Sequence, residues 1–187
     1  MALSFSPLMV YGESQLCWLP PGMRDAFAAT RADAAGQGIT IAVSDFGGAR
    51  TPGITEQLTA WRDAAVAKGE PWYRVSPFAL GKHGVGGAVD FRIVSRPATM
   101  SEETALARVG ALGRNHGLLW GGNFRASGGA ADPWHLESQW SRDQLAVRWD
   151  AWTQSPDYPR LGAADWTVLV VLAALFIVGG FFLFQRG

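Results

Sequence analysis

The sequence is poor in features that mark several common classes of protein. Its single cysteine, Cys17, excludes an internal disulfide and a structural metal held by a cluster of thiolates. Lysine plus arginine and aspartate plus glutamate number 16 each, so the net charge is zero and no nucleic-acid partner held by charge is expected. Residues 1–20 have neither a basic start nor an unbroken apolar run, so they predict no cleavable export signal.

Charge is also missing from residues 166–184, WTVLVVLAALFIVGGFFLF. A helix of this length rises about 28 Å, close to the roughly 30 Å hydrocarbon core of a bilayer. Asp165 and Arg186 flank the stretch, and Trp166 stands where an interfacial aromatic belongs. The sequence therefore predicts a single C-terminal transmembrane helix in a lipid bilayer rather than a buried core helix. The flanking charges are too few to orient it.

The sequence divides into an N-terminal arm (1–20), a domain (21–152) and a linker (153–165), and hydrophobic periodicity predicts both strands and helices within the domain. The expected strands are 39–45, 86–94 and 118–120, and the expected helices are 23–35, 52–68, 101–116 and one beginning at a Ser141–Gln144 capping box. The arm is expected to be extended or an edge strand. In the last helix, Trp149 and Trp152 are expected to pack against the domain, with a tryptophan-rich foot on a membrane surface as the alternative.

Three groups that suit a divalent metal lie in two short motifs. His83 and Asp90 belong to residues 81–90, GKHGVGGAVD, and His135 ends residues 132–135, DPWH. Two imidazoles and one carboxylate leave a fourth coordination position for water, as in catalytic zinc sites. Asp132 is the candidate base for that water, and Glu137 is its competitor.

The spacing of these residues resembles that of the M15 zinc peptidases, which include D-alanyl-D-alanine carboxypeptidases and phage L-alanyl-D-glutamate endolysins. The matching features are His, six residues, then Asp in Gly-Ala-Val-Asp, and an acid-x-Trp-His tetrapeptide. A Gly-x-Arg-Thr turn at 48–51, followed by Gln57, matches as well, and residues 120–124 fit the endolysin branch. The family usually has a serine at the position of Gly81, so one expected hydroxyl beside the ligands is missing.

The resemblance implies an α+β fold of the Hedgehog/DD-peptidase-like type, in which a small antiparallel sheet carries the metal and helices pack to one side. It implies Zn²⁺ bound by His83, Asp90 and His135, with Asp132 preferred over Glu137 as the base. Arg50 would hold the substrate or stabilise the oxyanion. The substrate-binding residues implied by the resemblance are Arg50, Gln57, Trp120 and Trp134.

The implied function is that of a membrane-anchored, zinc-dependent peptidoglycan peptidase, a phage lytic enzyme that cleaves wall stem peptides, with the L-Ala–D-Glu bond favoured. A D-Ala-D-Ala carboxypeptidase is the first alternative. The second is a membrane-anchored structural or wall-binding virion protein with weak or no hydrolysis. The anchor would sit in a virion membrane or in the host cytoplasmic membrane with the catalytic domain facing peptidoglycan. Other virion or membrane proteins would be further partners.

Overall fold

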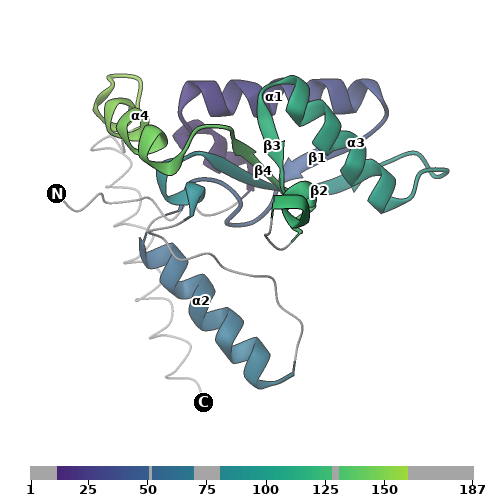
Figure 1. The fold of residues 1–187 in the computed structure, drawn as a ribbon, viewed down its shortest axis with the longest axis horizontal. Coiled ribbons are helices and arrows are strands. Elements are labelled where there is room, and N and C mark those ends of the chain that lie inside the picture. The colour runs from purple at the N-terminus through teal and green to yellow at the C-terminus, as the bar shows by residue number, and fades with distance from the viewer. Residues whose placement is uncertain (1–11, 51, 70–80, 128–130, 160–187) are drawn as a thin grey trace, which may run out of the picture.

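The computed structural model describes residues 12–50, 52–69, 81–127 and 131–159, and among these four strands form one antiparallel sheet (Figure 1). The strands are β1 (Thr40–Val43), β2 (Ala88–Ser95), β3 (Leu118–Trp120) and β4 (His135–Ser138). Their order in the sheet is β1-β2-β4-β3, and each neighbouring pair is antiparallel. The long strand β2 therefore pairs with a strand on each side and lies inside the sheet. The predicted class, helices with a small antiparallel sheet, is confirmed.

Two of the helices pack together on the sheet (Figure 1). The helices are α1 (Pro21–Gly36), α2 (Pro52–Ala67), α3 (Glu102–Asn115) and α4 (Arg142–Gln154), and the 3₁₀ helices are η2 (Gly12–Trp18), η3 (Lys82–Val85) and η4 (Gly121–Ser127). Helices α1 and α3 lie side by side over the sheet, α4 lies at one end against η3, and α2 lies apart from α1 and α3.

Successive side chains of strand β2 point to opposite faces of the sheet, one toward the core and the other toward the site. Val89 and Phe91 are fully buried in one core cluster with Phe27 of α1 and Val109 of α3. Asp90 lies between them in sequence, so its side chain leaves the opposite face of the sheet. The apolar positions of β2 thus fix the direction of this carboxylate.

Helix α4 packs against the domain, as predicted. Its capping box is present, with Ser141 and Gln144 exchanging backbone and side-chain hydrogen bonds. Trp149 and Trp152 are buried, and the indole of Trp152 donates to the carbonyl of Trp18, 2.9 Å away. Tyr158, which lies in the expected linker (153–165), is buried against these rings.

One expectation about local structure was wrong, and one strand was missed. Residues 12–18 form the 3₁₀ helix η2 rather than an extended arm, and β4 was not predicted as a strand. Strand β4 has only four residues, HLES, and none is β-branched, so it carries little strand propensity of its own. The predicted transmembrane segment, 166–184, lies outside the described residues. Within the described residues, no helix is long and apolar enough to cross a membrane.

The substitution Gly110→Ala in α3 tests how tightly this helix packs on β3. A Cβ at Gly110 would overlap the indole of Trp120, which is held by a hydrogen bond to the carbonyl of Pro133. We expect Gly110→Ala to lower the free energy of unfolding by about 1–2 kcal/mol, because overpacking outweighs the gain in helix propensity. Gly22→Ala is the matched control in α1, where the new Cβ meets nothing within 4 Å. Urea unfolding in which both variants are equally stabilised would contradict this packing.

Candidate metal centre

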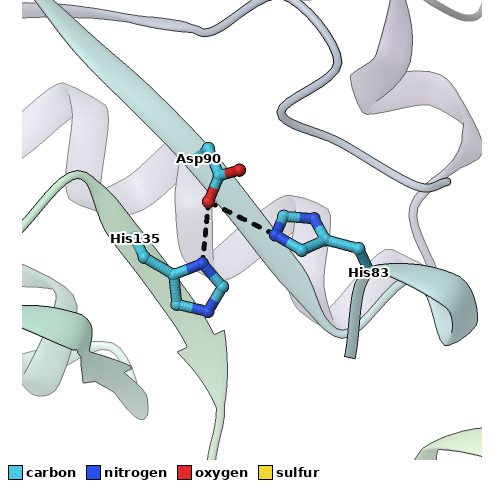
Figure 2. Close-up of side chains that lie close together, drawn as sticks. All are labelled: His83, Asp90 and His135. Atoms are coloured by element: carbon cyan, nitrogen blue, oxygen red, sulfur yellow. Dashed lines mark hydrogen bonds and ion pairs between the residues drawn. The ribbon is translucent and has the colours of Figure 1, made fainter. Parts of the chain in front are cut away.

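The structure brings His83, Asp90 and His135 together (Figure 2). One ligand atom from each residue lies within 4.8 Å of the others. Asp90 of β2 and His135 of β4 are paired directly across the sheet, so the strand register alone places these two side chains close together. His83 lies in η3, outside the sheet, and must be brought back to them by the chain that follows it.

A tight turn after η3 returns the chain to β2. Gly86 has φ 61°, the left-handed conformation that glycine adopts without strain, and the amide of Gly87 donates to the carbonyl of Lys82. A Cβ at Gly86 would overlap Trp149 and Pro20. Gly86 is therefore required both by the turn and by the close packing around it, and this turn lets His83 and Asp90, seven positions apart, face one another.

One nitrogen of each imidazole contacts a hydrogen-bond acceptor outside the cluster, so the other nitrogen faces Asp90. His83 Nδ1 lies 2.8 Å from the carbonyl oxygen of Gly48, which can only accept, so Nδ1 carries a proton. His135 Nε2 lies 3.1 Å from the Glu137 carboxylate. The inward nitrogens, His83 Nε2 and His135 Nδ1, lie 3.2 and 2.7 Å from the same Asp90 oxygen, Oδ1, where the two dashed lines of Figure 2 meet.

Arg50 holds the other oxygen of Asp90. Its Nη2 forms an ion pair with Asp90 Oδ2, and its Nε donates to the carbonyl of Phe46, 2.7 Å away. The guanidinium is buried, so this contact fixes the carboxylate and leaves Oδ1 toward the two imidazoles. In the structure Arg50 therefore contacts Asp90, one of the three candidate metal ligands. Its role toward substrate or oxyanion stays a prediction.

Burial and the short distances between these groups shift the pKa values of Asp90, His83 and His135. Burial alone would raise the pKa of Asp90, but His83, Arg50 and the imidazole hydrogen bonds hold that pKa well below its usual range. Burial lowers the pKa of His83, and the charge of Arg50 adds to this effect. Burial also opposes the charged form of His135, yet hydrogen bonds to Asp90 and Glu137 raise its pKa to about 9. Without a cation, His135 therefore shares with Arg50 and Lys82 the task of balancing the charges of Asp90 and Glu137.

Asp132 lies beside the cluster rather than within it. Its amide donates to the carbonyl of Gly121, and its carbonyl accepts from the amide of His135, so a short turn separates it from the ligand candidate. Burial raises the pKa of Asp132, and the negative charge of Asp90 raises it further. A carboxyl group with a raised pKa next to a cation site suits proton transfer.

The other residues singled out by the sequence lie on β3, α2, β4 and the turn that leads into β4. The Trp120 indole donates to the Pro133 carbonyl and so supports the turn that carries Asp132. Trp134 is 37% exposed, and its role toward substrate stays a prediction. Gln57 lies on α2, but its side chain is outside what the structure describes. Glu137, the competing base, is already bonded to His135 and to Lys82.

One contributor, Gln15 of η2, was missed by sequence reasoning. Its side chain is 1% exposed, and its Oε1 accepts from the amide of Gly48. The carbonyl of the same Gly48 accepts from His83, so one residue links η2 to a ligand candidate. A Cβ at Gly48 would overlap Gln15. No sequence signal identified this contact, because a lone glutamine in an irregular segment has no characteristic pattern.

Comparisons with known proteins give weak similarities. No protein-family model and no curated protein matches the sequence. Among solved structures, the zinc complex of the vancomycin-resistance D,D-pentapeptidase VanY from a VanB-type cassette is 19% identical, with a TM-score of 0.45, over 70% of this chain and 75% of that one. The L-Ala D-Glu endopeptidase ChiX of Serratia marcescens is 17% identical, with a TM-score of 0.36, over 68% of this chain and 93% of that one. Neither similarity is close enough to carry an argument about function.

Gln15→Met tests the support of the Gly48 peptide. Methionine has a similar length but cannot accept the amide hydrogen, so a buried donor is left unpaired. We expect the free energy of unfolding to fall by about 1–3 kcal/mol, measured by urea denaturation. Gln139→Met, at an exposed position, is the control and should change stability little. Equal stability of the two variants would show that the Gln15 bond contributes nothing.

Proposed function

We propose that the chain is a zinc-dependent peptidase acting on peptidoglycan stem peptides. The observation that carries the proposal is the cluster of His83, Asp90 and His135, whose ligand atoms lie within 4.8 Å of one another. The motif resemblance to the M15 peptidases supports the same reading independently of the coordinates. Asp132 supplies the neighbouring acid that such a site requires for hydrolysis.

The donor set suits zinc. Two imidazole nitrogens and one carboxylate oxygen form a three-ligand catalytic zinc set, with a further position left open. The outer nitrogen of each ring is bonded to an acceptor, Gly48 for His83 and Glu137 for His135, so the inner nitrogens are already aimed at the cation position. A bound zinc ion would supply Lewis acidity, which makes water acidic near neutral pH and polarises a carbonyl group.

The protein groups would divide the work of hydrolysis among them. Asp132 accepts the proton of the attacking water and then delivers it to the nitrogen of the leaving amine. Arg50 keeps Asp90 ionised and oriented, and this contact is visible in the structure. A role of Arg50 in stabilising the oxyanion is a further part of the proposal. Trp134, exposed beside the site, would contact the substrate together with Gln57.

The finer assignments rest on the sequence alone. The L-Ala–D-Glu bond is the proposed target, because residues 120–124 and Asp132 match the endolysin branch; D-Ala-D-Ala carboxypeptidase activity is the alternative. Residues 166–184 support the proposal of a membrane-anchored phage enzyme, in a virion membrane or the host cytoplasmic membrane. Detection of the protein in purified particles would separate these two locations.

Removal of metal is the first test of the function. The full chain should clear a peptidoglycan gel in zinc buffer, and a chelator should abolish the clearing until zinc is returned, because the cation supplies the Lewis acid. His83→Ala should behave like the chelated protein, whereas His116→Ala, outside the site, should remain active. Clearing that persists in chelator indicates another chemistry, and no clearing with zinc favours a wall-binding protein. The new termini of the released peptides identify the bond.

Asp132→Ala tests the base. We expect zinc to stay bound, because Asp132 is not a ligand, while turnover falls by about 10²–10⁴-fold. The measurements are zinc content by metal analysis and the rate of peptide release. Asp150→Ala, at an exposed position of α4, should keep full activity. Full activity of Asp132→Ala would remove the base assignment, and loss of zinc would make Asp132 a ligand instead.

A further inference from the structure

We propose that Glu137, held in place by Lys82, is a positioning residue that fixes the His135 ring with Nδ1 toward the cation and Nε2 carrying the proton. This inference rests on the proposed function, since it concerns the metal ligand His135. It assigns a role to two residues, Lys82 and Glu137, that no catalytic step uses.

The geometry of β4 places the Glu137 carboxylate beside Nε2 of the His135 ring. His135 and Glu137 are two residues apart, so both side chains leave the same face of the strand. Glu137 Oε2 lies 3.1 Å from His135 Nε2, while His135 Nδ1 faces Asp90, 2.7 Å away. The two nitrogens thus face opposite acceptors, one toward the cluster and one away from it.

The choice of nitrogen matters because a neutral imidazole has one donor and one acceptor nitrogen. A metal ligand must present its lone pair, so the proton must sit on the other nitrogen. A carboxylate beside Nε2 accepts a hydrogen bond from Nε2–H and stabilises the tautomer in which the lone pair of Nδ1 is free to bind the cation. His83 has the opposite tautomer, because its Nδ1–H donates to the Gly48 carbonyl and its Nε2 faces the cluster. The two ligands therefore use different nitrogens, each set by its own outer acceptor.

Lys82 fixes Glu137 in turn. Its Nζ lies 2.8 Å from Glu137 Oε1 and 2.7 Å from the Ser138 carbonyl. The side chains of Lys82 and Glu137 are only 18% and 16% exposed, so solvent screens this pair weakly. Lys82 directly precedes His83, so the ion pair also ties the segment that carries one imidazole to the strand that carries the other. A rigid carboxylate holds the His135 ring more firmly than a freely rotating one.

The experiment reads the tautomers directly on the full-length, zinc-loaded chain. Long-range ¹H–¹⁵N NMR of histidine rings distinguishes a proton on Nδ1 from one on Nε2, and the chain has three histidines. We expect the proton on Nδ1 of His83 and on Nε2 of His135. In Glu137→Gln we expect the His135 pattern to be lost or mixed, because an amide can also donate to Nε2. Zinc affinity, measured by competition with a chromophoric chelator, should fall about 10–100-fold.

Two further variants separate positioning from general damage. Lys82→Met should weaken zinc binding less than Glu137→Gln does and should add nothing in the Glu137→Gln background, because Lys82 acts through Glu137. Asp33→Asn is the matched control, since Asp33 bonds His116 Nε2 at 2.8 Å between α1 and the end of α3. It should leave zinc affinity and the His135 signals unchanged.

The outcomes are distinguishable from failure of the proposed function. If the unsubstituted protein binds no zinc, both the function and the positioning role are overturned. If it binds zinc and Glu137→Gln binds equally well with the same His135 tautomer, only the positioning role is overturned. Circular dichroism of the metal-free variants checks folding. If Glu137→Gln does not fold, Lys82→Met decides, and unchanged zinc affinity in that variant would overturn the proposal.

Discussion

The carboxylate of Asp90 is the point on which the site depends. One oxygen is held by Arg50, and the other faces the inner nitrogens of His83 and His135. The buried neighbours of Asp90 on β2, Val89 and Phe91, anchor the opposite face of the strand, so the carboxylate cannot turn away without exposing the core. A central strand of the sheet thus gives the cluster a rigid base, and the strand pairing supplies His135 directly opposite.

The remaining contacts hold the rings from outside. The Gly48 carbonyl fixes His83, and Gly48 is itself held by Gln15 from the N-terminal 3₁₀ helix. Glu137 and Lys82 do the same for His135. Gly48 and Gln15 are distant in sequence from His83 and from each other, and Lys82 is distant in sequence from Glu137 and His135. These contacts orient the inner nitrogens of both rings before a cation binds. Less conformational entropy is then lost when the cation binds.

The sequence predicted the parts of the molecule that have a strong local signal. The alternation in 86–94 predicted β2 and the direction of Asp90, the capping box predicted α4, and the two histidine motifs predicted the cluster. The short strand β4 was missed, because its pairing with β2 outweighs its weak propensity. The roles of Gln15 and Glu137 were missed as well, since each depends on a tertiary contact that no spacing in the chain reveals. The Arg50 contact with Asp90 was likewise visible only in three dimensions.

A crystal structure of the zinc-soaked protein, with anomalous scattering recorded at the zinc absorption edge, tests the central claim most directly. One strong anomalous peak should lie between His83 Nε2, Asp90 Oδ1 and His135 Nδ1, with Asp132 beside it but outside the ligand set. No peak at these three atoms, or a peak coordinated through the other nitrogen of either ring, would contradict the metal centre described above.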